Sequence, residues 1–108
     1  MPTYDPGETL AWSGVMSYDE KYSGTLYVTN RRLFFEYGRG ILKKKGYVTA
    51  ETPLEDITNV SLEKGPWDWN VLVIASKDGR HKFMFRGEHP EVLMGKISEI
   101  IAAHNSER

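Results

Sequence analysis

Apolar and polar residues alternate along residues 24–37, and this alternation is the clearest structural pattern in the sequence. Two alternating runs are joined by a short polar turn, which is typical of a β-hairpin. Asn30 suits the turn because its short amide tolerates positive φ and bonds its own backbone. The alternating apolar positions are Leu26, Val28, Leu33 and Phe35. We therefore predict a hairpin here, to which the rest of the sheet is added.

Five further runs have the alternation or the apolar content of β-strands. They cover residues 8–18, 47–49, 59–63, 71–75 and 82–86. A change of register near Gly14 predicts a bulge in the first of them. Residues 71–75 are apolar on both faces, which indicates a central strand, and the Asp78-Gly79 pair after them is a strong hairpin signal. Residues 53–57 begin with proline and predict a turn or one helical turn.

The period changes near the C-terminus, where apolar residues recur at helical spacing. Leu93, Ile97, Ile100 and Ile101 share one helix face, and Pro90 suits the first turn because its missing N–H costs nothing there. These residues predict an amphipathic helix over residues 90–104. Its single apolar stripe must be buried against the sheet.

Length and composition fit one globular domain. The chain has 108 residues, of which we expect 1–7 to be an irregular lead-in and 105–108 a tail. The net charge of −1 gives no sign of nucleic-acid binding, and the lack of cysteine removes disulfides and thiol chemistry. No catalytic or metal-binding motif is present, so we expect neither an enzyme nor a cofactor or metal.

The sequence also bears on location. The N-terminus has neither the basic nor the apolar part of a secretory signal. No apolar run approaches the ~20 residues that span a bilayer. We therefore expect a cytoplasmic protein, with any membrane association peripheral.

The order of these elements resembles the pleckstrin-homology (PH)-like superfold, and within it GRAM and bacterial PH-type domains. The resemblance covers roughly residues 8–104, and the GLUE domain of endosomal sorting complexes is similar in the same places. It is carried by Gly24, Leu26, Thr29, Asn30, Arg32, Leu33 and Phe35, and downstream by Leu54, Asp56, Ile57 and Val60. It implies an α+β, mainly β fold: a split barrel of about seven antiparallel strands capped by one C-terminal helix.

The resemblance also implies a non-catalytic binding module, either for lipids such as phosphoinositides or, as in GLUE domains, for ubiquitin. Phosphoinositide-binding PH domains carry basic residues in the loop between their first two strands. Here that loop has Asp19 and Glu20 against Lys21, and positive charge lies in a later loop instead.

That later loop, residues 38–46, is the first candidate site. Its charged residues are Arg39, Lys43, Lys44 and Lys45, all basic, around the apolar pair Ile41 and Leu42. Such a loop could contact anionic lipid headgroups, each cation contributing ~1 kcal/mol near the surface. The alternative is a solvated loop whose lysines discourage strand aggregation.

Two tryptophans form the second candidate site. Trp67 and Trp69 flank Asp68 in a loop that begins with Gly65-Pro66. Loops run over the surface, and an unpaired Asp68 resists burial, so we predict that at least one indole is exposed. An exposed indole suits a membrane interface or a protein contact. The alternative is that Trp67 folds back to close the barrel.

Two functions follow. The first is peripheral binding to anionic membrane lipids through the basic loop and the tryptophan loop, which requires both at one end of the barrel. The second is protein interaction of the GLUE type, with ubiquitin or another partner, through exposed apolar residues such as Met84 and Met94. The sequence leaves the oligomeric state open.

Overall fold

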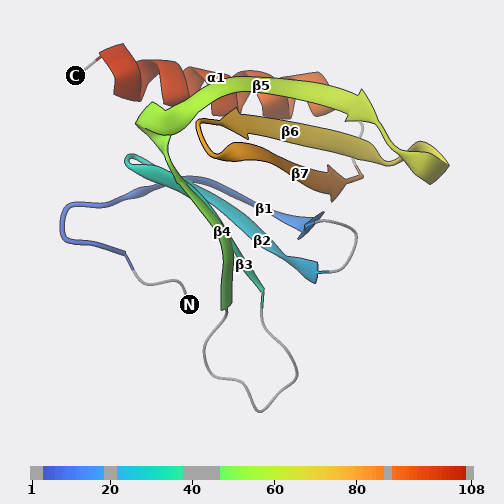
Figure 1. Ribbon diagram of the computed structural model, residues 1–108, viewed down its shortest axis with the longest axis horizontal. Coiled ribbons are helices and arrows are strands. Elements are labelled where there is room, and N and C mark those ends of the chain that lie inside the picture. The colour runs from blue at the N-terminus through green and yellow to red at the C-terminus, as the bar shows by residue number, and fades with distance from the viewer. Residues whose placement is uncertain (1–3, 19–21, 38–46, 87–88, 107–108) are drawn as a thin grey trace.

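Seven β-strands and one C-terminal α-helix make up the described part of the chain (Figure 1). The structure, a computed structural model, describes residues 4–18, 22–37, 47–86 and 89–106. The strands are β1 (Leu10–Tyr18), β2 (Tyr22–Thr29), β3 (Arg32–Tyr37), β4 (Tyr47–Pro53), β5 (Ile57–Lys64), β6 (Asn70–Ser76) and β7 (Gly79–Phe85). The helices are the single turns η1 (Leu54–Asp56) and η2 (Pro66–Asp68) and the long helix α1 (Pro90–Ser106).

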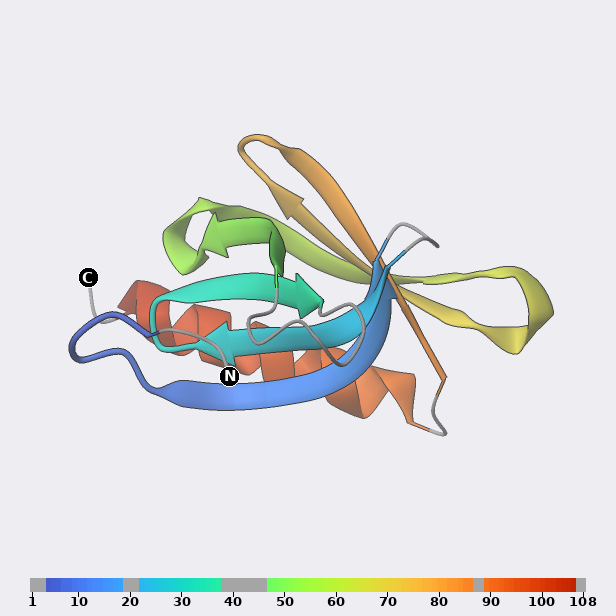
Figure 2. The same ribbon diagram turned by 90° about the horizontal axis from the view of Figure 1, so that it is seen from below.

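The strands form one antiparallel sheet in the order β4-β3-β2-β1-β7-β6-β5. Its weakest junction joins β1 to β7, where only Ser17 pairs with Met84 and Tyr18 with Phe83 in the described residues. The sheet therefore divides into two layers, β1–β4 and β5–β7, which diverge from this junction (Figures 1 and 2). The predicted split barrel of antiparallel strands with one C-terminal helix is confirmed.

The predicted hairpin is formed by β2 and β3, with Leu26 opposite Phe35 and Val28 opposite Leu33. The two-residue turn between them is held by Thr29, whose hydroxyl accepts hydrogen bonds from the backbone N–H of Arg31 at 3.1 Å and of Arg32 at 3.0 Å.

The role predicted for Asn30 in this turn was wrong. Its φ is not positive, and its amide oxygen accepts a hydrogen bond from the N–H of Thr9 at 2.9 Å. The amide nitrogen donates to the carbonyl of Gly7 at 3.2 Å. Asn30 therefore anchors the segment before β1 rather than its own turn.

The core lies between the two layers. Phe35 from one layer and Phe83 from the other are fully buried, with ring centroids 5.7 Å apart. The prediction that residues 71–75 form a central strand is confirmed, since β6 lies between β5 and β7 and its first five residues are buried. Leu72 and Ile74 face the core.

Several element boundaries differ from the predictions. The irregular register in the pairing of β1 with β2 lies between Leu10 and Trp12, whereas Gly14 pairs regularly with Leu26. Strand β4 is longer than predicted because its pairing with β3 continues to Pro53, and β5 is longer because its pairing with β6 runs from Ile57 to Lys64. The predicted turn at residues 53–57 is η1, and the Asp78-Gly79 hairpin joins β6 to β7.

Helix α1 covers the open side of the barrel and packs against β5 and η1. Ile97 and Ile101 are buried in the core cluster, and Leu93 and Ile100 pack against it, as their spacing predicts. The imidazole of His104 ties the end of the helix to two loops. Its Nδ1 lies 3.0 Å from the carbonyl oxygen of Asn30, and its Nε2 lies 3.1 Å from a carboxylate oxygen of Glu55.

The burial of α1 gives a first testable prediction. Ile97 has no exposed surface, so Ile97→Ala should lower the free energy of unfolding by ~2–5 kcal/mol. The matched control is Val92→Ala on the same helix, where the side chain is 65% exposed and the change should be small. Urea denaturation followed by circular dichroism measures both. Equal midpoints for Ile97→Ala and the unmodified protein would contradict this packing.

Candidate binding surfaces

A buried ion pair joins the segment before β1 to the central hairpin. The carboxylate of Glu8 is fully buried and accepts hydrogen bonds from Arg32 Nε at 2.8 Å and Nη2 at 3.1 Å. The hydroxyl of Thr29 donates to the same carboxylate at 2.6 Å, and the N–H of Asp5 at 3.0 Å. Arg32 also pairs with Glu51 and lies 4.2 Å over the ring of Phe34. The guanidinium is thus engaged within the fold, which gives Arg32 a structural role.

These contacts shift the titration of both partners. The hydrogen bonds from Arg32, helped by those from Thr29 and Asp5, lower the pKa of Glu8 from 4.5 to about 2, although burial alone would raise it. The same pairing raises the pKa of Arg32 above its ordinary value. Because the pKa of Glu8 is depressed in the folded state, its contribution to stability is complete above pH 4.5. That contribution is lost as the pH falls from 4.5 through about 2.

The substitution Glu8→Gln tests this linkage. At neutral pH it should lower the free energy of unfolding by about 2–3 kcal/mol, because the ionised carboxylate favours the folded state. The difference from the unmodified protein should shrink as the pH falls from 4.5 to 2. Urea denaturation over a pH series measures it. Glu63→Gln is the control, since that exposed carboxylate lies 3.6 Å from Lys82 and should matter little. If the difference in free energy of unfolding between Glu8→Gln and the unmodified protein does not change with pH, the pKa of Glu8 is not depressed by folding.

The tip of the β5–β6 hairpin carries the tryptophans. The N–H of Gly65 donates to the carbonyl of Trp69 at 2.9 Å, and the N–H of Trp69 donates to that of Pro66 at 3.1 Å. These bonds close a tight loop in which Trp67 and Asp68 have φ values of 57° and 65°. The Trp67 side chain is 85% exposed, which confirms that one indole faces solvent.

Trp69 behaves differently from Trp67. It is half-buried, and the guanidinium of Arg86 lies 4.6 Å from the centre of its ring. Such stacking of a cation on an indole contributes ~0.5–1 kcal/mol at exposed sites. Trp69 thus fixes the base of the tip, and Trp67 is presented to the outside.

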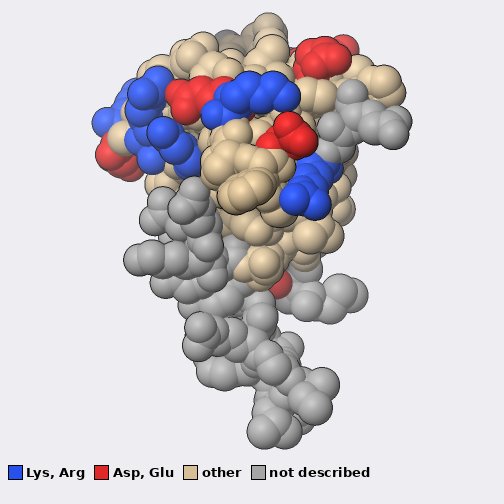
Figure 3. All heavy atoms as spheres, turned by 90° about the vertical axis from the view of Figure 1, so that its right-hand side faces the viewer, with Lys and Arg blue, Asp and Glu red and all other residues tan. Residues whose placement is uncertain are grey.

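The surface around η2 combines apolar and basic groups. Figure 3, which faces this end of the molecule, shows an uncharged patch bordered by basic side chains, with acidic ones between them. Met84 is half-buried and lines a hollow of about 310 Å³ together with Trp67 and Trp69. Lys64 on β5, Lys82 on β7 and Arg86 directly after β7 are exposed cations on the elements that carry the tip.

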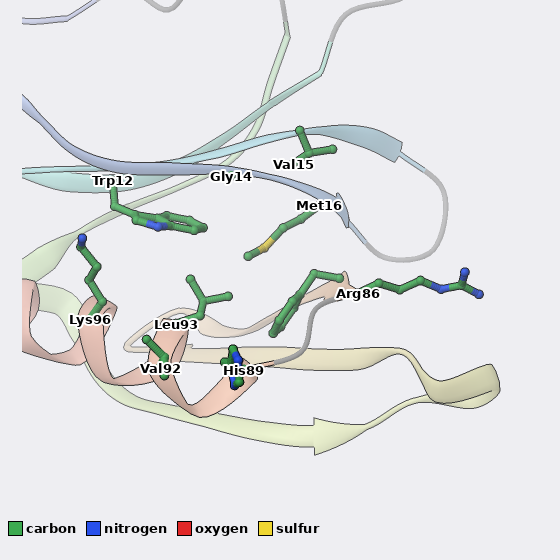
Figure 4. Close-up of a pocket in the computed structure, with 10 residues that line it drawn as sticks. Trp12, Gly14, Val15, Met16, Arg86, His89, Val92, Leu93 and Lys96 are labelled. Atoms are coloured by element: carbon green, nitrogen blue, oxygen red, sulfur yellow. The ribbon is translucent and has the colours of Figure 1, made fainter.

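A second candidate surface is a groove of about 360 Å³ between β1 and the first turns of α1 (Figure 4). Trp12, Met16 and Leu93 point into it, and Phe85 lines it. Val15 is 80% exposed. The charged residues among the described lining are basic, Arg86 and Lys96, and His89 also lines the groove.

The shape of this groove depends on Gly14. A Cβ atom at that position would lie 2.5 Å from Cη2 and 2.7 Å from Cζ2 of Trp12. The indole therefore lies directly over the Gly14 backbone, and a side chain at position 14 would force it to shift. This close approach leaves Trp12 half-buried, with its ring forming one wall of the groove.

The structure describes only some of the other predicted site residues, and it does not bring those together. Arg39, Lys43, Lys44 and Lys45 lie outside the described residues. Met94 is half-buried and packs against the core cluster, whereas Met84 belongs to the η2 surface. Sequence reasoning missed Glu8 and the groove, because both arise from contacts between distant segments.

Two further observations concern metals and membranes. In the described ranges there is no group of three or more His, Asp or Glu side chains placed to hold a metal ion. No helix among the described residues has the length and apolar character needed to cross a membrane.

Comparisons with known proteins define the fold. The sequence matches no protein-family model, and no curated protein matches it. The structure is similar to the C-terminal domain of an unknown protein from Leishmania infantum, with a TM-score of 0.65 at 15% identity over 90% of this chain and 87% of that one. It is also similar to the Vav1 exchange factor, in a structure concerned with its PH and C1 domains. That match has a TM-score of 0.54 at 13% identity, over 88% of this chain and 25% of Vav1. These likenesses support a PH-like fold.

The contact between Gly14 and Trp12 can be tested directly. Alanine is normally better than glycine inside a strand, so a loss of stability in Gly14→Ala would reveal the steric conflict. We expect a loss of ~1–3 kcal/mol and a more solvent-exposed Trp12. The measurement is made in a protein that also carries Trp67→Phe and Trp69→Phe, so that the fluorescence comes from Trp12 alone. Acrylamide quenching then reports the exposure of Trp12. The control is Ser13→Ala, whose side chain is exposed. Unchanged quenching in Gly14→Ala would refute the contact.

Proposed function

We propose that this domain is a non-catalytic, peripheral membrane-binding module that docks on anionic lipid surfaces with the η2 tip. The observation that carries the proposal is the 85% exposure of Trp67 at the end of the β5–β6 hairpin. Indole side chains favour the boundary between lipid headgroups and acyl chains. This function agrees with the resemblance to GRAM and GLUE domains and with a cytoplasmic protein associated with a membrane surface.

The backbone of the tip supports a functional reading of Trp67. A φ of 57° is unfavourable for a bulky residue and costs ~1–3 kcal/mol. Such strain persists when the surrounding structure imposes it, and it concentrates at binding and switch sites. Here the closed loop from Gly65 to Trp69 imposes it, and the result is an indole held away from the core. A rigidly presented anchor loses little conformational entropy on binding.

Positive charge supplies the second part of the interaction. Lys64, Lys82 and Arg86 lie on the elements around the tip, although Lys82 also pairs with Glu63. The predicted basic loop, Arg39 with Lys43 to Lys45, would add cations that attract the same lipids. The ends of β3 and β4 that flank this loop lie away from η2 in Figures 1 and 2, so the loop and the tip need separate tests.

Sedimentation with vesicles of graded anionic lipid content tests the proposal. Trp67→Ala should weaken binding about tenfold or more, because an exposed indole loses its apolar contact with the interface. Trp67→Tyr should retain most of the binding. Leu10→Ser is the matched control, since Leu10 is also an exposed apolar residue but lies at the start of β1. Each variant should keep the unfolding midpoint of the unmodified protein within error.

A second arm separates the basic loop from the tip. Replacing Lys43, Lys44 and Lys45 by Glu should also weaken vesicle binding if the loop takes part, and binding should fall as salt is raised. If neither the lysine variant nor Trp67→Ala changes vesicle binding, neither the basic loop nor the η2 tip contacts the membrane. If the unmodified protein ignores anionic vesicles, the proposed function is wrong.

Protein binding of the GLUE type is a second candidate, favoured by the hollow that Met84 forms with Trp67 and Trp69. Exposed tryptophan beside methionine is typical of protein contact sites. Titration of labelled protein with ubiquitin, followed by NMR, distinguishes this candidate. Shifts confined to the η2 surface in the absence of vesicle binding would favour it over the membrane.

A further inference from the structure

The inference starts from the second edge of β1. This strand pairs with β2 along its length, but with β7 only at Ser17 and Tyr18. Over Leu10–Met16 the described pairing therefore uses one edge only. In an antiparallel pair, alternate residues point their N–H and C=O groups away from the partner, so this stretch offers main-chain donors and acceptors on its other side.

The exposed edge lacks most of the usual protection against strand addition. Native edge strands are commonly blocked by charged residues, proline or bulges. Residues 10–16, LAWSGVM, contain no charge and no proline. The one irregularity, between Leu10 and Trp12, lies at the start of the strand and leaves the rest regular. Such an edge is suited to pairing with another extended segment.

The groove beside this edge has the chemistry of a side-chain pocket. Its walls are apolar, with Trp12 and Met16 on the β1 side and Leu93 on the helix (Figure 4). Val92 is 65% exposed and adds apolar surface at the helix lip. An extended strand places alternate side chains on one face, so an added strand could insert its apolar residues here.

Charge indicates what kind of segment fits. The charged residues among the described lining, Arg86 and Lys96, are basic and lie at opposite ends of the view in Figure 4. A second copy of this chain would offer the uncharged edge of residues 10–16, which has no carboxylate to pair with Lys96, and this disfavours pairing of two β1 edges. Arg86 points its guanidinium away from the groove in Figure 4 and stacks it on Trp69, so Lys96 is the cation that a segment rich in Asp or Glu would meet.

We propose that the groove between β1 and α1 binds an extended acidic peptide segment of a partner protein, which adds to the β1 edge as a further strand. Its main chain pairs with alternate residues of Leu10–Met16. Its apolar side chains lie against Trp12, Met16 and Leu93, and its acidic side chains face Lys96. Because Lys96 lies on α1 and not at the η2 tip, substitutions at Lys96 test this interaction apart from membrane docking.

Synthetic peptides test the proposal with defined probes. The first is a fluorescein-labelled peptide of about seven residues in which valine alternates with glutamate. The second has lysine in place of every glutamate. Fluorescence anisotropy with the unmodified domain should show the acidic peptide binding about tenfold more tightly or better. Amide NMR shifts caused by the acidic peptide should centre on Leu10–Met16.

Two N-methylated versions of the acidic peptide test main-chain pairing. One carries methyl groups on the amides of even positions, the other on the amides of odd positions. A strand offers its N–H groups alternately to its two sides, so only one version should lose binding. Equal binding by both would show that the groove holds side chains without strand addition, which overturns the proposal.

Protein variants test the charge and the groove. Lys96→Glu should weaken binding of the acidic peptide and strengthen binding of the lysine peptide. The control is Lys77→Glu at the β6–β7 turn, where the side chain is also exposed, and it should change binding of neither peptide. Val92→Ser should weaken binding of both peptides. The stability of the domain should not change, because Val92 is largely exposed. Vesicle binding by Lys96→Glu should match that of the unmodified protein.

Two other outcomes would reject the proposal. One is that neither peptide binds while the variants remain folded. The other is a dimer in sedimentation velocity that persists in excess acidic peptide and shows its NMR contacts at β1, because the edge would then be occupied by a second copy.

Discussion

The structure depends on the junction at which β1 meets β7. The pairing there consists of Ser17 with Met84 and Tyr18 with Phe83. The ring of Tyr18 reinforces it, with its centroid 5.7 Å from that of Phe35 and 5.2 Å from that of Phe83, and its hydroxyl 2.9 Å from Nδ1 of His81. One aromatic side chain therefore contacts both layers of the barrel where their backbones connect. Beyond it the layers diverge, and their apolar faces must be covered by something else.

The divergence accounts for both the helix and the groove. Helix α1 contributes the buried side chains of Ile97 and Ile101 to the core. The helix packs against β5 and η1, so its first turns do not close the space beside β1. Trp12 partly fills that space by lying over Gly14. What remains is an apolar groove next to an incompletely paired strand, a direct consequence of a barrel that is split.

Sequence patterns predicted the parts of this fold that are periodic. The hairpin, the central strand and the helix each repeat at their own spacing, and burial follows that spacing at Leu26, Leu72 and Ile97. Loop chemistry predicted that at least one of Trp67 and Trp69 is exposed, but not that the exposed one is Trp67. No period reveals that Glu8 pairs with Arg32, because the partners lie 24 residues apart and meet only when the hairpin folds against the N-terminal segment. The groove was hidden for the same reason, since β1 and α1 are distant in sequence.

The two candidate surfaces meet at Arg86. Its guanidinium stacks on Trp69 at the base of the η2 tip, and the same residue lines the groove beside β1. Its guanidinium points away from the groove in Figure 4, so a carboxylate bound in the groove would have to draw it off the indole. A membrane bound at the tip would instead hold the cation beside lipid phosphates. Because a coupling free energy between two sites is reciprocal, any weakening of lipid binding by a peptide implies an equal weakening of peptide binding by lipid. Coupling through Arg86 would therefore be negative, and its size would be limited to that of a partly exposed ion pair.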